Sequence, residues 1–296
     1  MAVFTRDHLT GLQPQHNALV GLDSDGCVFP TMEIKQKQCF HGEIARHWHL
    51  EEIERHVREC AEFINLHSCW RGTNRFPALL LTFELLAKRP DVLATNVKLP
   101  NTSALRHYIN SGLPLSNATL GEEVKRTGDL ELVRLLTWSL AVNANIERTA
   151  KNIPPFQWVL ESLNKIQLHA DLIVVSQTPE EALVREWKEN ALDHFPAVIA
   201  GQELGTKADH LQLAAGNKYA AGRVLMVGDA LGDLQAAEAV HALFYPINPG
   251  HEAKSWQRFH AEAFDKFLAG TFAGDYQAAR IREFETLLPE LPPWKK

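Results

Sequence analysis

Six acidic, basic and hydroxyl side chains lie at or just after the ends of short apolar runs, or in the connections between them. They are Asp23, Asp25, Ser176, Lys207, Asp229 and Asp233. In an open parallel sheet, ligands bind beyond the carboxyl ends of the strands, so residues at such positions can form one site. A single strand-end aspartate is usually a turn residue or a helix cap. Turn chemistry alone does not explain the whole set.

These residue types suit metal-assisted chemistry on a phosphoryl group. Clustered carboxylates repel one another unless a cation lies between them, and hard oxygen ligands of this kind favour Mg²⁺. The Asp23 carboxylate is a competent nucleophile that can form an aspartyl-phosphate, and Asp25, two residues further on, can act as acid and base. Lys207 would offset negative charge, and the Ser176 hydroxyl would donate to a phosphoryl oxygen.

Continuous apolar runs that end at turn residues predict the strands that position these side chains. The runs are Asn17–Leu22, Ala170–Val175, Ala197–Ala200, Arg223–Val227 and Ala242–Ile247. Helical patterns separate the later runs, over Pro179–Leu192, Lys207–Gly216 and Leu231–Val240. Strands that alternate with helices of this length predict βαβ units and a parallel sheet.

The segment from about residue 31 to residue 155 shows no convincing strand and has helical patterns instead. Ile44–Cys60 is charged and amphipathic, Pro77–Lys88 is apolar at helical spacing, and Leu130–Ala150 follows the helix-capping residue Asp129. We therefore expect a helical domain inserted after the first strand. The tail after residue 250 is helical again, and its recurring aromatic residues are expected to pack on the sheet domain.

Four short motifs resemble those of the haloacid dehalogenase superfamily. Gly21-Leu-Asp-Ser-Asp-Gly-Cys-Val-Phe29 is similar to its first motif, in which apolar residues precede DxDGxV, and Val227–Asp233 is similar to the fourth, GDxxxD. Ser176 and Lys207 stand where the second and third motifs are expected. All four occur in family order over the sheet domain, somewhat more than half the chain. The helical insert resembles the cap that many members carry after the first motif.

The resemblance implies an α/β fold with a Rossmann-like parallel sheet in the strand order 5-4-1-2-3. An all-helical cap domain would be inserted into this core, and a C-terminal helical extension would follow it. The predicted boundaries are residues 1–31 with 156–250 for the core, 32–155 for the cap, and 251–296 for the extension packed on the core.

The resemblance also implies a Mg²⁺-dependent phosphohydrolase that acts on a small phosphorylated metabolite. Asp23 would attack the phosphoryl group, Asp25 would be the general acid and base, and Ser176 and Lys207 would hold the phosphoryl group. The implied magnesium ligands are Asp23, Asp25 through its backbone carbonyl, Asp229 and Asp233, the last directly or through water. The presence of Asp25 argues against the dehalogenase branch of the family, which lacks a carboxylate there and uses no metal.

Substrate-binding residues are expected in the core motifs and in one loop of the insert. In the loop Trp70–Phe76, two arginines flank a glycine and an asparagine, and guanidinium groups match anionic oxygens well. The alternative for this loop is a solvated connection whose arginines pair with nearby glutamates. The residues predicted to bind substrate are Arg71, Asn74, Arg75, Gly26 and Gln177.

Two further groups of residues leave alternatives open. Lys218 also precedes the fourth strand, but we favour Lys207 because it starts a helix at a strand tip, where function gathers. Four histidines of the insert, His41, His47, His49 and His56, could suggest zinc. Their spacing does not place them on one helix face, however, so a metal site there is not expected.

Composition excludes several classes of protein. Thirty lysines and arginines stand against 36 aspartates and glutamates, so there is no basic excess to match nucleic-acid phosphates. No apolar stretch is long enough to span a bilayer, and the N-terminus does not resemble a signal peptide. Four cysteines without a CxxC pair are typical of reduced thiols in the cytoplasm. We expect a cytoplasmic protein whose partner is a small phosphorylated substrate, as a monomer or a homodimer.

Three alternative functions share the same core. One is a phosphomutase, and another is a hydrolase of C–P bonds, a reaction that in this superfamily uses a cap lysine as a Schiff base. No lysine of the insert is expected in a clearly desolvated setting, which ranks this route lower. The third is a non-catalytic binding protein. Retention of all the acidic positions argues against it, since buried carboxylates are costly without a use.

Overall fold

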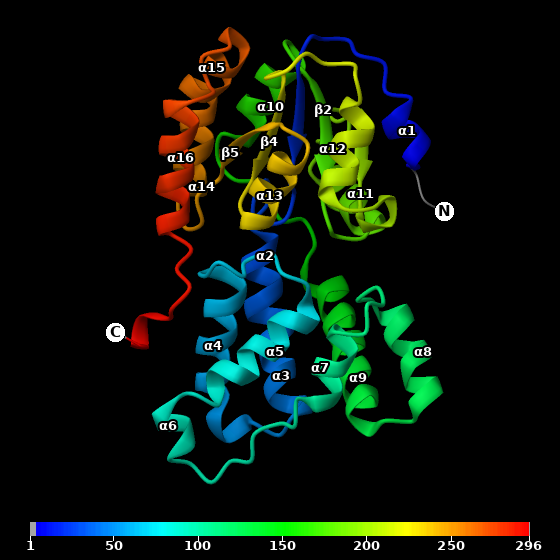
Figure 1. Ribbon diagram of the computed structural model, residues 1–296, viewed down its shortest axis with the longest axis vertical. Coiled ribbons are helices and arrows are strands. Elements are labelled where there is room, and N and C mark those ends of the chain that lie inside the picture. The colour runs from blue at the N-terminus through cyan, green and yellow to red at the C-terminus, as the bar shows by residue number, and fades with distance from the viewer. Residues whose placement is uncertain (1–3, 296) are drawn as a thin grey trace. The chain divides into compact units, whose positions relative to one another are not determined.

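The protein is described here by a computed structural model that covers residues 4–295 and groups them into two compact units (Figure 1). The core unit comprises Met1–Met32 and Lys151–Pro289, and the helical unit comprises Glu33–Ala150 and Glu290–Lys296. Among the described residues, none of the helices combines the length and hydropathy that crossing a membrane requires.

The core unit contains one parallel sheet of five strands. They are β1 (Leu19–Leu22), β2 (Asp171–Val175), β3 (Val198–Ala200), β4 (Val224–Gly228) and β5 (Leu243–Pro246). Their order is β3-β2-β1-β4-β5, and Leu22 pairs with Val174 on one side and Val227 on the other. The predicted fold class and strand order are confirmed. β1 therefore lies at the centre, with the ends of β2 and β4 beside it.

Helices cover both faces of the sheet. One face buries Val20 and Leu22 against α10 (Val159–Gln167), α11 (Glu180–Glu189), α14 (Glu252–Arg258) and α15 (Phe264–Ala269). The other face buries Leu19 against α1 (Arg6–Thr10), α12 (Lys207–Ala215), α13 (Leu231–Ala239) and α16 (Asp275–Thr286). A Cβ atom at Gly21 would lie 2.5 Å from Leu211 Cδ2, so this glycine lets α12 pack closely on β1.

The aromatic residues of the tail belong to the core of the first face. Trp256, Phe259, Phe264 and Phe267 are fully buried there, along α14, the π-helical turn η4 (Phe259–Ala263) and α15. Hydrophobic burial thus attaches the chain after β5 to the sheet. Trp294 has a different place, because it packs in the helical unit against Phe63, with ring centroids 5.8 Å apart.

The helical unit has no strand between residues 33 and 150. Its helices are α3 (His41–His47), α4 (Glu54–Leu66), α5 (Arg75–Leu86), α6 (Pro90–Leu93), α7 (Ser103–Ile109), α8 (Asn117–Thr127) and α9 (Leu130–Thr149), after α2 (Thr31–Ile34) and the π-helical turn η1 (Lys35–Phe40). Its core centres on Trp48 and Trp138, whose rings lie 5.9 Å apart. The predicted single helix over Ile44–Cys60 is wrong, because the chain breaks at His49, whose φ of 55° does not fit a right-handed helix.

Candidate active site

Asp23 and Asp229 follow two neighbouring strands of the sheet. β1 and β4 pair in parallel, and the Asp23 N–H donates to the Val227 carbonyl at 3.0 Å. Asp23 is 4% exposed and Asp229 is fully buried. Parallel pairing therefore brings both carboxylates to the carboxyl edge of the sheet, as the sequence predicted.

The first turn of α13 adds a third carboxylate, that of Asp233. Its Oδ2 atom accepts from the N–H groups of Asp229 and Ala230, both at 3.0 Å, and so satisfies donors that the start of a helix leaves unpaired. A Cβ atom at Gly228 would lie 2.4 Å from Asp233 Cγ. The glycine of the fourth motif therefore makes room for the aspartate that ends it.

Lys207, the first residue of α12, connects two of these carboxylates. Its Nζ atom lies 2.9 Å from Asp23 Oδ2 and 2.5 Å from Asp233 Oδ1. Lys218 instead donates to the Leu9 carbonyl at 3.2 Å, away from the cluster. The structure thus places Lys207, and not Lys218, among the acidic residues.

The cluster carries more negative than positive charge. When all are ionised, Asp23, Asp229, Asp233 and Lys207 sum to a formal charge of −2. Burial raises the pKa of Asp23 well above its usual 3.8; Lys207 opposes this, while Asp233 and Asp229 add to it. Burial disfavours the charged form of Lys207, but the attraction of Asp23 and Asp233 outweighs it and raises the lysine pKa.

The donor set fits a hard divalent cation. One carboxylate oxygen from each of Asp23, Asp229 and Asp233 lies within 4.8 Å of the others. Carboxylate oxygens at this spacing and a surplus of two negative charges match Mg²⁺, which usually takes one or two carboxylates from a protein. The Asp25 side chain is not in this group, so its predicted role as a ligand through its backbone carbonyl stays a prediction.

Two threonine hydroxyls hold the Asp25 carboxylate. Thr31 Oγ1 donates to Oδ1, and Thr178 Oγ1 donates to Oδ2 at 2.6 Å. Gly26 turns the chain next to it with a φ of 81°, and its N–H donates to the Phe29 carbonyl at 2.8 Å. Neither threonine was predicted. Thr178 lies 153 residues from Asp25 in the chain, so only the fold shows that they meet.

Two buried tryptophans brace the loop that follows β1, and neither was predicted to do so. Trp187 Nε1 donates to Ser24 Oγ at 3.1 Å, and Trp256 Nε1 donates to the Cys27 carbonyl at 2.8 Å. Buried indole N–H groups need acceptors, so each ring fixes the position of the loop. Cys27 is itself fully buried, and burial raises the pKa of its thiol. All four cysteines are free thiols.

Ser176 and Gln177 follow β2. The Ser176 N–H donates to the Ala200 carbonyl of β3 at 3.0 Å, and its Oγ accepts from the Thr178 N–H at 3.2 Å. Gln177 Nε2 donates to the Gly205 carbonyl at 2.9 Å and thereby ties this loop to the one before α12. The substrate-binding roles predicted for Gln177 and Gly26 stay predictions.

The residues predicted to bind substrate in the helical unit have structural contacts of their own. Asn74 caps α5 by accepting from the Phe76 N–H at 3.0 Å, and its Nδ2 donates to the Leu115 carbonyl at 3.0 Å. Arg71 is 7% exposed and donates to the Leu66 carbonyl at 3.0 Å. Their substrate-binding roles are not tested by these contacts.

The guanidinium of Arg75, unlike the side chains of Asn74 and Arg71, is a candidate anion-binding group because neutral groups surround it. Nη1 donates to the carbonyl and hydroxyl of Ser139 at 3.2 and 2.9 Å and to Asn143 Oδ1 at 2.8 Å, and the group lies 5.2 Å from the centre of the Phe40 ring. Burial lowers the pKa of Arg75 to about 10. Among residues 4–294, whose side chains are described, no carboxylate pairs with it.

The helical unit also contains a buried lysine. Lys35 is 8% exposed and begins the π-helical turn η1. The expectation that no lysine of the insert is desolvated is therefore wrong. The sequence did not reveal this, because the charged stretch that contains Lys35 reads as an exposed helix surface.

Three of the four named histidines of the insert lie beside separate carboxylates. The nearest such contacts are His41 to Glu62 at 4.0 Å, His47 to Glu43 at 3.4 Å and His56 to Asp91 at 3.0 Å. Within the described part of the chain, the only group of metal-ligand atoms is that of the three core aspartates.

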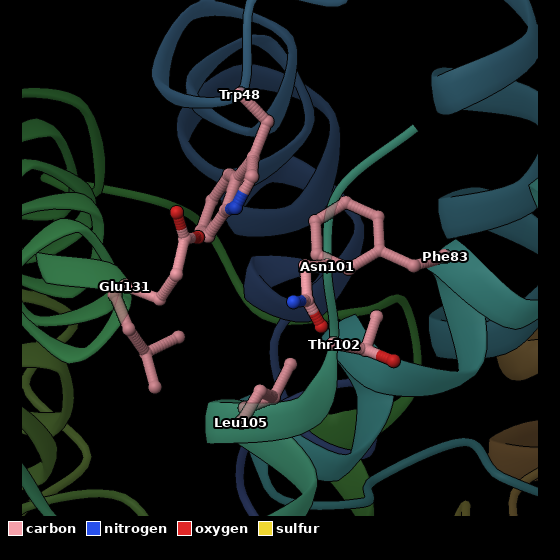
Figure 2. A pocket seen from close by; sticks show the side chains of 7 residues that line it. Trp48, Phe83, Asn101, Thr102, Leu105 and Glu131 are labelled. Atoms are coloured by element: carbon pink, nitrogen blue, oxygen red, sulfur yellow. The ribbon is translucent and has the colours of Figure 1, made fainter. Parts of the chain in front are cut away.

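A small cavity lies inside the helical unit (Figure 2). Trp48, Phe83, Leu105 and Glu131 are among the side chains around it. Its volume of about 10 Å³ has room for about one water molecule. This cavity is therefore too small to hold a metabolite.

Neither a protein-family model nor a curated protein matches this sequence. Solved structures of haloacid dehalogenase-like hydrolases match most of the chain. One from Streptococcus pneumoniae matches with 12% identity and a TM-score of 0.41, covering 81% of this chain and 90% of its own. A HAD-superfamily hydrolase of subfamily IA from Geobacter sulfurreducens matches with 13% identity and a TM-score of 0.37, covering 79% and 90%.

A third match is a Bacillus subtilis protein assigned as a HAD-hydrolase and solved with magnesium. It has 12% identity and a TM-score of 0.39, and the match covers 78% of this chain and 86% of that one. At these identities and TM-scores the matches describe similarity of fold, and the functional argument rests on the residues of this chain.

Proposed function

We propose that the protein is a haloacid dehalogenase-type phosphohydrolase that needs Mg²⁺ and cleaves a small phosphorylated metabolite through an aspartyl-phosphate on Asp23. One observation carries the proposal: Lys207 joins Asp23 to Asp233 beside Asp229 at the carboxyl edge of the sheet. A lone acidic residue could be structural. A nucleophilic carboxylate held by a lysine next to two more carboxylates is an arrangement suited to phosphoryl transfer.

In the first step, an Asp23 oxygen attacks the phosphorus atom and the bond from phosphorus to the leaving oxygen breaks. Asp25 gives a proton to that oxygen as it leaves. Lys207 and the Ser176 hydroxyl stabilise negative charge on the phosphoryl oxygens. Bound Mg²⁺ would supply further charge neutralisation. Asp23, Asp229, the Asp25 backbone carbonyl and Asp233, directly or through water, would hold it.

In the second step, water attacks the phosphorus atom of the aspartyl-phosphate. Asp25, now ionised, takes a proton from that water, and the Asp23 carboxylate is released together with inorganic phosphate. The hydroxyls of Thr31 and Thr178 hold both Asp25 oxygens, which supports a fixed direction for this proton transfer.

The substrate is proposed to carry a second anionic group that Arg75 binds. A largely buried guanidinium without a carboxylate partner is costly, and an anionic ligand would offset that cost. The three hydrogen bonds from Nη1 to Ser139 and Asn143 would keep the guanidinium oriented while its remaining N–H groups meet the ligand.

The test uses purified protein and an aryl phosphate. Wild type should release phosphate with Mg²⁺ and lose the activity with EDTA. Asp23→Asn should abolish turnover and the acid-stable label that ³²P-labelled substrate leaves on the wild type, whereas Lys188→Ala, an exposed change in the core unit, should do neither. Inactivity of wild type over a broad panel of phosphate esters, with no phosphoryl label, would refute the proposal.

The burial of Lys35 favours one alternative, C–P bond hydrolysis through a Schiff base. The Lys35 amine would be the nucleophile that forms the Schiff base with an aldehyde group of the substrate. Borohydride should then trap an aldehyde phosphonate on wild type but not on Lys35→Met. Phosphate release from aryl phosphate that is insensitive to borohydride, without any trapped adduct, would rule this alternative out.

A further inference from the structure

A polar pocket lies in the core unit, just beyond the end of β5. Its volume is about 250 Å³. It is formed by the loop after β5, by α14 and by α16, and its lining residues are Asn248, His251, Lys254, Ser255, Arg258 and Glu283. None of them belongs to the acidic cluster or to the motifs described above, so the pocket has no part in the proposed reaction.

The walls of the pocket are fixed by hydrogen bonds between buried groups. Asn248 and Ser255 are 4% and 3% exposed, and the Asn248 N–H donates to Ser255 Oγ at 3.0 Å. Asn248 Nδ2 donates to Glu283 Oε1 at 3.0 Å, while Glu283 Oε2 accepts from Arg258 at 2.8 Å. The pocket is thus built from an ordered network and is not a gap between mobile side chains.

The network leaves one buried acceptor unused. Glu283 is an acceptor, so it determines which end of the Asn248 amide faces it, and the Oδ1 end points elsewhere. Among the described residues, Asn248 Oδ1 has no hydrogen-bond partner. A buried carbonyl oxygen without a donor is unfavourable, and a ligand hydroxyl or N–H group would satisfy it.

Basic residues line the pocket from α14 and from the residue just before it. Lys254 and Arg258 lie four residues apart on one face of α14, and His251 is the residue just before the helix begins. Only Arg258 pairs with a carboxylate among the described residues, and that carboxylate, Glu283, is the one acidic group of the lining. The pocket therefore has a surplus of positive charge in a chain whose net charge is −6.

We propose that this pocket binds a small anionic metabolite, a phosphate or carboxylate whose remaining part carries a hydroxyl or N–H donor. Lys254 and His251 would bind the anionic group, and the donor would bond to Asn248 Oδ1. The volume is smaller than the roughly 300–1,000 Å³ of pockets for drug-sized ligands, which suits a ligand of few atoms.

The pocket lies near the carboxyl edge of the sheet but shares no residue with the acidic cluster. The Ile247 N–H donates to the Gly228 carbonyl at 2.8 Å. Ile247 directly precedes Asn248 in the chain, and Gly228 directly precedes Asp229. A ligand in the pocket therefore sits next to the β4–β5 pairing that carries Asp229. Binding there does not depend on Mg²⁺ or on the chemistry of Asp23, so its failure would leave the proposed function standing.

The test measures anion binding to the full chain in EDTA, so that no divalent cation holds the anion at the acidic cluster. Inorganic phosphate and glycerol 3-phosphate are titrated by NMR. Both should bind saturably with shifts of the Asn248 side-chain amide and α14, and the hydroxylated ligand should bind more tightly. Lys254→Ala should weaken both about tenfold or more, as loss of one charge-assisted hydrogen bond predicts.

Lys188→Ala is the matched control, since it removes an exposed lysine of the same unit away from the pocket. It should leave both affinities unchanged. The proposal is overturned by non-saturable binding, by equal affinity of wild type and Lys254→Ala, by equal weakening in both variants, or by shifts confined to residues 23–29. Lys254 and His251 are exposed, so single alanine variants should fold, and circular dichroism checks that they do.

Discussion

Replacing Lys207 by methionine should make the stability of the protein strongly dependent on pH and Mg²⁺. Methionine keeps much of the side-chain volume but removes the ammonium group that lies 2.9 Å from Asp23 Oδ2 and 2.5 Å from Asp233 Oδ1. Three buried carboxylates then remain without their lysine. We expect the loss to be a charge effect and not a packing effect.

The distances from Lys207 to the two carboxylates set the size of the expected loss of stability. At about 3 Å and an effective dielectric constant of about 20, each ion pair is worth roughly 5 kcal/mol before the cost of desolvating Lys207 is counted. Removing one partner of a buried ion pair typically costs about 3–5 kcal/mol, because the remaining charge is left uncompensated. We expect a loss of that size in EDTA at about pH 8, where all the carboxylates of the unfolded chain are ionised.

The pH dependence has a definite sign. Burial raises the pKa of Asp23 above 3.8, so folding in EDTA takes up a proton over the range between 3.8 and the folded pKa. Stability therefore falls as the pH rises through that range. Loss of Lys207 raises the Asp23 pKa further and extends the fall to higher pH. The difference between variant and wild type should be small near pH 4, largest near pH 8, and reduced by excess Mg²⁺.

The assay is urea unfolding of wild type and Lys207→Met at several pH values, with EDTA and with Mg²⁺. Lys188→Met controls for loss of an exposed lysine and should change the unfolding free energy by less than about 0.5 kcal/mol. Adding Asp233→Asn to Lys207→Met should recover part of the loss by removing one carboxylate. A loss that is the same at all pH values and unchanged by Mg²⁺ would refute the electrostatic reasoning.

Three further predictions concern other parts of the protein. Gly228→Ala places a methyl carbon 2.4 Å from Asp233 Cγ, so Mg²⁺ affinity measured by calorimetry should fall about tenfold or more. Thr178→Val removes a hydroxyl that donates to Asp25, so kcat for an aryl phosphate should fall about tenfold with a shifted pH profile and a nearly unchanged KM. Burial lowers the pKa of His41 to about 3, so folding stability should be lost as the pH falls from 6.5, by about 1.4 kcal/mol per unit, and His41→Leu should lose less in acid urea unfolding.

Each of these has a control or a contradicting result. Gly232→Ala is the control for Gly228, because a Cβ atom there meets nothing within 4 Å, and it should leave Mg²⁺ affinity unchanged. Thr178→Ser keeps the hydroxyl and should restore most of the activity; equal rates for Thr178→Val and wild type would contradict the role given to Thr178. The His41 prediction fails if wild type and His41→Leu lose the same stability between pH 7 and pH 5.

Much of the fold follows from local patterns. Apolar runs that end at a turn residue predicted all five strands, because a strand covered on both faces needs apolar side chains throughout. The long helices α5 and α9 followed from apolar spacing and, for α9, from the cap Asp129, whereas the capping role of Asn74 came only from the structure. The break at His49 was missed, because one left-handed residue leaves no signal in hydrophobic periodicity.

The sequence by itself determined which residue types end the strands, and so it predicted Asp23, Ser176 and Asp229 at one edge of a parallel sheet. Spacing along the chain is enough for this, since parallel strands place their ends together. It also determined that Asp233 follows Asp229 within one helical turn, where it can cap the helix.

Only the tertiary structure decided which side chains meet across the core. It selected Lys207 over Lys218, gave Asp25 the Thr178 hydroxyl from 153 residues away, and set the Trp256 indole on the Cys27 carbonyl from 229 residues away. It also buried Lys35, which sits in a charged stretch. The physical reason is that a hydrogen bond or ion pair needs atoms within about 3 Å, and the chain positions that reach this distance are chosen by packing of the whole core and not by any local pattern.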